Sequence, residues 1–281
     1  MQIKELNESM TNEFLEVLQR KNYRQKTITN YKSTYNQLVD FLGNRIMLHD
    51  VKVAEVFKFF TELELKNSYK PTTFNFKVSA IKSLFNYMQL INARSDVPIT
   101  NLMYKKIDKK EPKTLSKDVQ KKWLKFLNKH SQGDQLIAAR IQLATGMRIE
   151  EVREMDLIND LEIVNGKGYI HIQEAKGRKS RICPIFNENL TNDLEKMRES
   201  LYILGSYKLY LHQRPYQHQT KIFKEETGLY VTSHMLRATF ATERYEDGMD
   251  INTIRILLGH ESINTTLIYI AYRKDIYDLI A

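Results

Sequence analysis

Two stretches in the second half of the chain place charged side chains where a helix would ordinarily be apolar. In ATGMRIEEV, Arg148 follows a glycine turn and stands at the start of a predicted helix. In TSHMLRATFAT, His234 and Arg237 are three residues apart, so both side chains project from one face of a helix. Leu236 and Phe240 lie on the opposite flank, which predicts that this helix is half-buried.

Two further stretches add a histidine, a lysine and a pair of tyrosines. LLGHESINTTLIYIAY contains His260, Tyr269 and Tyr272, and helical geometry alone puts both tyrosines on nearly the same face. Lys176 lies in AKGRK, at the tip of a predicted β-hairpin, where a flexible ammonium group could swing over a bound ligand. Each residue alone is ordinary. Their joint occurrence in one domain of a basic protein is what indicates a site.

These residue types together suit in-line attack on a phosphodiester. Negative charge develops on the non-bridging oxygens, and guanidinium groups match those oxygens with paired hydrogen bonds while staying charged at any working pH. Tyrosine is mostly protonated at neutral pH, so as a nucleophile it needs a nearby base, a task that suits histidine. A lysine on a mobile tip could protonate the departing sugar oxygen. No acidic cluster of the magnesium-binding type accompanies the set, so we expect chemistry without a metal ion or another cofactor.

The elements that must position these residues are helices around a small sheet. The runs LEIV (161–164), GYIHIQ (168–173) and SRICPI (180–185), separated by Asn165-Gly166 and AKGRK, predict three antiparallel strands. Helices are predicted at LSKDVQKKWLKFLNKH, with Trp123 in the core, and at DQLIAARIQLATG, NENLTNDLEKMRESLYIL, SHMLRATFATERYEDG and INTIRILLGH. We expect KLYLHQRPYQHQTKIFKE to be irregular.

The first 95 residues predict a separate helical domain. Apolar residues recur at helical spacing in four segments, with Thr11 and Thr27 as predicted N-caps of the first two and Pro71 just before the fourth. Residues 96–113 contain two prolines and a run of lysines, and they predict a basic linker. Residues 114–281 would then form the second domain. The fold class is therefore mainly α with a small antiparallel sheet.

Composition limits the class of partner. The chain has 281 residues, and 43 Lys and Arg against 34 Asp and Glu give it a net charge of +9. This balance suits a polyanionic partner, either nucleic acid or an anionic membrane surface. The single cysteine, Cys183, excludes an intramolecular disulfide framework and a cysteine-rich zinc site. Neither a signal peptide nor a membrane-spanning apolar run is present, so we expect a cytoplasmic protein that uses no membrane.

Three stretches resemble the sequence boxes of the tyrosine recombinase (phage integrase) family. TGMRIEEV is similar to its first arginine box, HMLRATFAT to its His-x-x-Arg box, and LLGHESINTTLIY to its Gly-His…Tyr box, in family order and with the hairpin lysine between the first two. KTITNYKSTYNQLVDFL and TTFNFKVSAIKSLFNYM resemble the SAM-like core-binding domain of the family. The resemblance spans nearly the whole chain. With no arm-binding domain expected, the length is similar to that of Xer-like recombinases and also to that of integron-type and small transposon or phage recombinases.

The resemblance implies a role for each residue of the site. Arg148 and Arg237 would clamp the scissile phosphate, and Glu151 would be the acidic residue that supports the site. His234 would act as general base or proton shuttle, and His260 would donate a hydrogen bond to the phosphate.

The general acid and the nucleophile follow from the same resemblance. Lys176 would protonate the 5′-hydroxyl leaving group, although Lys167 and Lys179 have similar local settings. In the family the nucleophile lies nine residues after the Gly-His histidine, which selects Tyr269 rather than Tyr272.

The implied mechanism is two transesterifications through a 3′-phosphotyrosyl bond, in integration, excision or resolution. The implied partner is double-stranded DNA with paired recombination half-sites. A homotetramer would bind it as a dimer on each site, with an accessory DNA-bending protein or a partner recombinase as a further expectation. The segment after Tyr269 would either pack on its own domain or dock into a neighbouring protomer.

Two other activities compete with this interpretation. A type IB topoisomerase uses the same residue types but relaxes supercoils alone, and a helical N-terminal domain of recombinase type disfavours it. A DNA-binding regulatory protein of the same fold without strand exchange would have lost motif residues, and none is altered in this sequence.

Overall fold

The computed structural model describes residues 2–107, 113–130, 134–173, 180–204 and 213–267. The chain divides into two compact units, Met1–Lys109 and Lys110–Ala281. Each unit encloses a hydrophobic core of its own. The predicted class is confirmed, because both units are mainly helical and the sheet is small and antiparallel.

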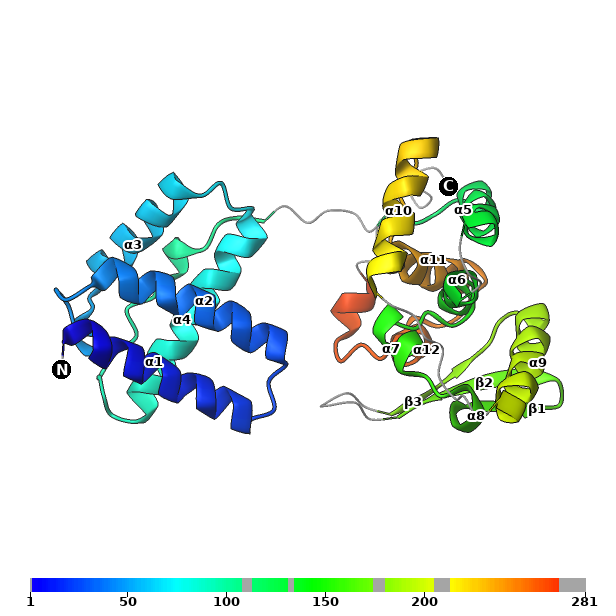
Figure 1. The fold of residues 1–281 in the computed structure, drawn as a ribbon, viewed down its shortest axis with the longest axis horizontal. Helices are drawn as coiled ribbons and strands as arrows, with labels where there is room; N and C mark the ends of the chain where they lie inside the picture. The colour runs from blue at the N-terminus through cyan, green and yellow to red at the C-terminus, as the bar shows by residue number, and fades with distance from the viewer. Residues whose placement is uncertain (1, 108–112, 131–133, 174–179, 205–212, 268–281) are drawn as a thin grey trace. The chain divides into compact units, whose positions relative to one another are not determined.

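Four helices form most of the first unit (Figure 1): α1 Ile3–Arg20, α2 Gln25–Leu42, α3 Val53–Lys66 and α4 Pro71–Leu90. Two 3-10 turns, η1 Leu48–Asp50 and η2 Asn101–Met103, belong to the same unit. Pro71 occupies the first position of α4, where the missing amide proton has no helical partner to lose. The predicted apolar stripes face inward and bury Phe14, Tyr35 and Leu84.

The two predicted threonine caps are wrong. Thr11 lies inside α1, and Thr27 lies within the first turn of α2. The start of α1 is fixed instead by a capping box between Gln2 and Glu5. The backbone amide of Gln2 donates to the Glu5 carboxylate at 2.9 Å. A capping pair without serine or threonine gives a weaker sequence signal than the one that the prediction relied on.

Much of the segment predicted as a linker packs on the first unit. Met103 is buried in its core. Asn75 exchanges two hydrogen bonds of 2.8 Å with the backbone of Lys105. The Lys105 ammonium lies 4.5 Å from the centre of the Phe74 ring and forms an ion pair with Glu64. Lys105, the first residue of the lysine run, is therefore part of the folded first unit.

The second unit combines helices with the small sheet, which lies at one edge of the unit (Figure 1). Five helices come from sequence stretches that predicted them, and α7 continues from the glycine turn after α6. The elements are α5 Lys117–His130, α6 Asp134–Thr145, α7 Ile149–Glu154, α8 Leu157–Asp160, β1 Leu161–Val164, β2 Lys167–Ile172, β3 Arg181–Pro184, α9 Glu188–Leu204, α10 Gln213–Thr227, α11 Ser233–Glu246 and α12 Ile251–Leu258. Residues 263–267 form a further helical turn.

The sheet has the order β1-β2-β3, and both pairs are antiparallel, as predicted. Asn165 and Gly166 join β1 to β2 with φ angles of 50° and 75°, the conformation that a tight two-residue hairpin turn requires. Ile172 pairs with Arg181 at the end of β2 and β3 that leads to residues 174–179.

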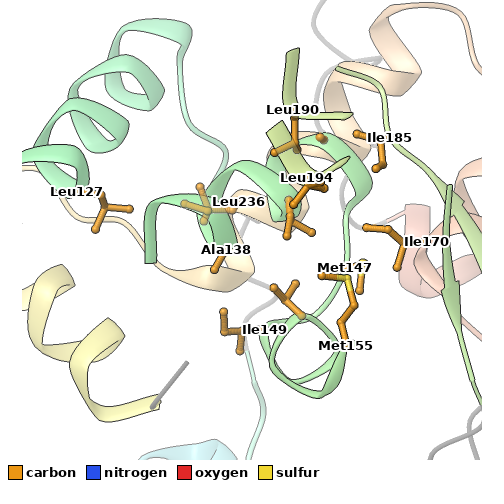
Figure 2. Packing of buried hydrophobic residues seen from close by; sticks show 14 of the residues in the cluster. Leu127, Ala138, Met147, Ile149, Met155, Ile170, Ile185, Leu190, Leu194 and Leu236 are labelled. Atoms are coloured by element: carbon orange, nitrogen blue, oxygen red, sulfur yellow. The ribbon is translucent and has the colours of Figure 1, made fainter. Parts of the chain in front are cut away.

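The core of the second unit lies between one face of the sheet and the helices that cover it. Figure 2 shows Ile170 and Ile185 facing Leu190 and Leu194 of α9. Trp123 is fully buried in the same cluster, as predicted. This packing fixes the sheet against α9, while α12 lies against β3.

Residues 213–225 contradict the prediction of an irregular segment, because they lie in α10. The composition of QRPYQHQTKIFKEET is polar, and Phe223 is its one fully buried side chain among those described. Apart from Pro215, the stretch contains only three apolar or aromatic residues, Tyr216, Ile222 and Phe223, too few for the repeated i, i+3, i+4 pattern by which a helix is predicted. Pro215 is tolerated because it lies in the first turn.

None of the helices in the described ranges combines the length and apolar character needed to cross a membrane.

Candidate active site

The C-terminal end of α12 is the centre of the site. The helix ends at Leu258, and its C-cap Gly259 has a left-handed φ of 63°. The cap amides donate to the Arg255 and Ile256 carbonyls, so the carbonyls of Leu257 and Leu258 remain for side-chain donors.

Arg237 donates from Nη2 to the Leu258 carbonyl and from Nη1 to the Gly146 carbonyl at 2.7 Å. The negative end of the helix dipole favours this buried cation. Arg237 is thus held in one orientation by backbone from two segments.

Arg148 reaches the same helix end from α7, as its N-cap residue. Its Nη1 lies 3.4 Å from the Leu258 carbonyl, and its Nη2 lies 3.3 Å from the Gly259 carbonyl. Nη1 also donates to Glu151 at 2.9 Å, and the Arg148 amide donates to the other carboxylate oxygen at 2.7 Å. The predicted helix start is confirmed, and Glu151 supports Arg148 directly.

A third arginine, Arg181 on β3, was missed by sequence reasoning. Its Nη1 and Nη2 donate to the two oxygens of Glu151 at 3.1 and 2.7 Å, and its Nε donates to the Leu257 carbonyl at 2.8 Å. A signal for it existed in SRICPI. Arg181, Cys183 and Ile185 alternate along the strand, and the latter two are buried, so the arginine shares the inward face and needs a partner there.

Glu151 remains a carboxylate at any working pH. Burial acts to raise its pKa, but the hydrogen bond and charge of Arg181 and the amide and charge of Arg148 outweigh burial and lower the pKa to about 2. One buried anion therefore bridges two cations.

His260 follows Gly259 and lies among the same arginines. Burial and then the charges of Arg237, Arg148 and Arg181 lower its pKa to about 4. Its Nδ1 lies 2.9 Å from the hydroxyl oxygen of Thr266, which is fully buried. The imidazole is therefore neutral at neutral pH.

A cavity of about 560 Å³ opens beside these residues. Arg148, Arg237 and the exposed His234 line it, so the structure brings Arg148 together with the His234 and Arg237 pair, which the sequence selected from a separate stretch. The remaining lining residues come mainly from α10 and the approach to α11: Gln217, Thr220, Lys221, Lys224, Tyr230, Thr232 and Ser233, with Gln142, Ile149 and Glu150. In the ranges that the structure describes, no group of three or more His, Cys, Asp or Glu side chains could hold a metal ion.

Gly146 explains why the first arginine box contains a glycine. Its φ is 69°, and a Cβ atom there would lie 2.4 Å from Cδ1 of Phe240. Only glycine fits this turn between α6 and α7, and the turn delivers both Arg148 and the carbonyl that binds Arg237.

Four candidate residues lie outside the described residues: Lys176, Lys179, Tyr269 and Tyr272. Lys167 is described and begins β2 beside the Asn165-Gly166 turn. At about 3.3 Å per residue, it lies roughly 17 Å along the strand from Ile172, the partner of Arg181.

Comparisons with known proteins agree with this architecture. The model of the phage integrase family matches residues 113–275, and that of the phage integrase N-terminal SAM-like domain matches residues 10–90.

Relatives and solved structures extend the match over most of the chain. A tyrosine recombinase of Agathobacter rectalis is 30% identical over 92% of this chain and 91% of its own length. XerA of Pyrococcus furiosus is 31% identical over 76% and 74%. A post-cleavage complex of the XerH recombinase with a difH substrate has a TM-score of 0.72 at 22% identity, covering 90% of this chain and 78% of the other. The Tn1549 transposon integrase bound to transposon right-end DNA has a TM-score of 0.72 at 17% identity, with both chains fully covered. The chain belongs to the phage integrase family, the tyrosine recombinases.

Proposed function

We propose that this enzyme is a site-specific recombinase that cuts and rejoins duplex DNA through a 3′-phosphotyrosyl intermediate, in integration, excision or resolution. The observation that carries the proposal is the convergence of Arg148, Arg237 and His234 on one cavity. His260 lies close enough to the same arginines for their charges to lower its pKa.

Arg148 and Arg237 would bind the scissile phosphate. Carbonyl groups at the end of α12 and at Gly146 already hold their guanidinium groups, so little reorganisation is needed as negative charge develops. Glu151 keeps Arg148 in place and is itself ionised throughout.

The two histidines would have different tasks. If the Thr266 hydroxyl donates to Nδ1 of His260, the ring proton sits on Nε2, which can donate to a phosphate oxygen. His234 is exposed in the cavity and would take the proton of the nucleophile, as general base or shuttle.

Lys176 and Tyr269 complete the proposed set. Lys176 belongs to the segment that connects the Ile172 end of β2 to Arg181 at the start of β3, which supports Lys176 over Lys167 at the other end of β2. Lys179 belongs to that segment too. Tyr269 follows the helical turn at 263–267, and Thr266 of that turn contacts His260, which supports a nucleophile close to the site.

The reaction then balances without an external energy source. The Tyr269 oxygen bonds to phosphorus as the 5′-oxygen leaves, the base takes the phenolic proton, and Lys176 protonates the leaving oxygen. A 5′-hydroxyl from a second duplex reverses these steps and releases Tyr269. Each step exchanges one phosphodiester for another, so catalysis consists of positioning and charge stabilisation.

The proposed partner is double-stranded DNA carrying paired half-sites, bound as a dimer on each site and as a homotetramer in synapsis. Residues 1–95 would bind DNA and residues 114–281 would cut it. The net charge of +9 suits a polyanion. Solved λ integrase structures of similar fold include a dimer on a core site and a tetramer on a Holliday junction. A DNA-bending protein or partner recombinase would be an accessory.

The test begins with sequencing the DNA that the purified protein retains. A duplex with that sequence and a nick near the cleavage point loses its short 5′-hydroxyl fragment after cutting, which traps the covalent intermediate. We expect a protein–DNA adduct that resists detergent and forms without ATP. Sequence-specific binding without an adduct would instead support a regulatory protein, and relaxation of supercoiled DNA without strand exchange would support a topoisomerase.

A further inference from the structure

Arg181 lies beside the site but is not among the residues that line its cavity. We propose that Arg181 is a positioning residue for DNA cleavage: it neutralises the Glu151 carboxylate and so leaves the positive charge of Arg148 for the scissile phosphate. This role rests on the proposed function, and neither the family models nor the sequence boxes assign it.

The geometry argues against direct contact between Arg181 and DNA. All three nitrogen atoms of its guanidinium group donate to protein, two of them to Glu151 and one to the Leu257 carbonyl. The side chain is 5% exposed. By contrast, the Arg148 side chain is 26% exposed and lines the cavity. Arg181 therefore acts through other residues.

The proposed role of Arg181 follows from the charges of Glu151, Arg148 and Arg181. Glu151 is 3% exposed and bonds both arginines, so the three groups together carry one net positive charge. Without Arg181, Glu151 and Arg148 would form a neutral pair in a poorly screened interior. The Glu151 carboxylate would then cancel the charge of Arg148, and the attraction between Arg148 and a phosphate would weaken.

The bond to α12 adds a second positioning effect. Arg181 fixes the Leu257 carbonyl, one residue before the Leu258 carbonyl that receives Arg237 and Arg148. The close approach needs Gly259, because a Cβ atom there would lie 2.9 Å from Nη1 of Arg181. The glycine of the Gly-His box thus makes room for this arginine.

A neutral substrate separates this role from simple structural support. Replacing a non-bridging oxygen of the scissile phosphate by methyl gives a methylphosphonate, which lacks the negative charge that Arg148 must attract. We would measure single-turnover adduct formation at saturating nicked duplex for both substrates, together with DNA affinity and thermal unfolding.

For Arg181→Met we expect adduct formation on the normal phosphate to fall roughly 10- to 100-fold, less than the ~10²–10³ typical of losing a direct donor. The fold-loss on the methylphosphonate should be at least about tenfold smaller, because no phosphate charge is left to stabilise. Arg181→Lys keeps the charge but not the paired hydrogen bonds, so it should retain the wild-type ratio between the substrates at an intermediate rate.

The matched control is Arg140→Met, which breaks the 2.7 Å ion pair between Arg140 and Asp193 in the same unit. It should change neither the rate nor the ratio. Equal proportional losses on both substrates for Arg181→Met, with wild-type adduct formation intact, would overturn the role of Arg181 alone. Absence of an adduct from the wild type would overturn the proposed function, and the role of Arg181 with it.

A second arm decides the matter if Arg181→Met does not fold or if the methylphosphonate is not cut. In a Glu151→Gln background there is no anion to neutralise, so adding Arg181→Met should reduce adduct formation by less than about threefold relative to Glu151→Gln alone. A loss as large as in the wild-type background would contradict charge compensation.

Discussion

Both units of this recombinase bury arginine, yet they use it differently. In the first unit, the Arg94 side chain is 3% exposed and donates to the carbonyls of Leu48 and Val51 at 3.2 and 3.0 Å. It also pairs with Asp96 at 2.8 Å and lies 4.6 Å from the centre of the Phe85 ring. This arginine ties the end of α4 to the η1 region.

In the second unit, arginines also bind carbonyl groups, but there they meet at one helix end. Arg148 and Arg237 share the Leu258 carbonyl, and both line the cavity. The carboxylate that pairs with Arg148, Glu151, is buried, whereas the Asp96 that pairs with Arg94 is 67% exposed. A buried guanidinium group by itself therefore does not indicate a functional site, whereas two arginines that line one cavity do.

The largest effect should come from Arg148→Ala. Removing a guanidinium that we propose binds the scissile phosphate should lower the single-turnover rate of adduct formation by ~10²–10³. DNA affinity should be largely retained, because the 43 Lys and Arg residues of the chain leave many other cations to attract the DNA backbone. Arg237→Ala should lower the rate of adduct formation by the same factor or by more. Near-wild-type cleavage by either variant, measured on the nicked duplex, would contradict the proposed role of these arginines at the phosphate.

Arg94→Ala should have the opposite profile. Losing hydrogen bonds from a buried charged group should lower the free energy of unfolding by about 2–3 kcal/mol, measured by urea titration. Adduct formation per folded molecule should be unchanged. A cleavage defect in Arg94→Ala at full occupancy of DNA would show that the two buried arginines are not functionally distinct.

Gly259→Ala should combine strain with displacement of Arg181. A left-handed φ costs an alanine roughly 1–2 kcal/mol, and the new Cβ would also press on a guanidinium that is fixed by three hydrogen bonds. Gly228→Ala is the matched control, because Gly228 has a φ of 68° with no atom within 4 Å. Only Gly259→Ala should also slow adduct formation; equal stability losses with equal cleavage would contradict the contact.

The smallest effect concerns pH. The histidine of the unfolded chain takes up a proton near pH 6.5, whereas folded His260, with its pKa of about 4, does not, so falling pH favours unfolding. Between pH 7.5 and 5.5 the wild type should lose about 1 kcal/mol of stability that His260→Gln does not lose. Parallel stability curves from urea titrations of the two proteins would contradict a neutral, buried His260.

The sequence predicted the cavity residues because each breaks a local pattern. Arg148 follows a glycine turn, and His234 and Arg237 place two charged or titratable groups on one face of a helix whose opposite flank carries Leu236 and Phe240. The three-stranded sheet was also predictable, because Asn165-Gly166 separates two β-like runs.

Two features, the role of Arg181 and the α10 helix, were not predicted from the sequence, and each has a physical reason. Arg181 was read as part of an ordinary strand, although its place on the buried face demanded a partner whose identity only tertiary packing supplies. The α10 helix is so polar that its few apolar residues do not repeat often enough in the sequence to predict a helix. Neither the partner of a buried charge nor a nearly all-polar helix is determined locally.

The most direct test of the account is to identify the residue that becomes joined to DNA. The adduct trapped on the nicked duplex would be digested, and the nucleotide-bearing peptide located by mass spectrometry in the wild type, Tyr269→Phe and Tyr272→Phe. We expect attachment at Tyr269, loss of the adduct in Tyr269→Phe and retention in Tyr272→Phe. Attachment at Tyr272, or no covalent adduct from a protein that binds the duplex, would contradict the account.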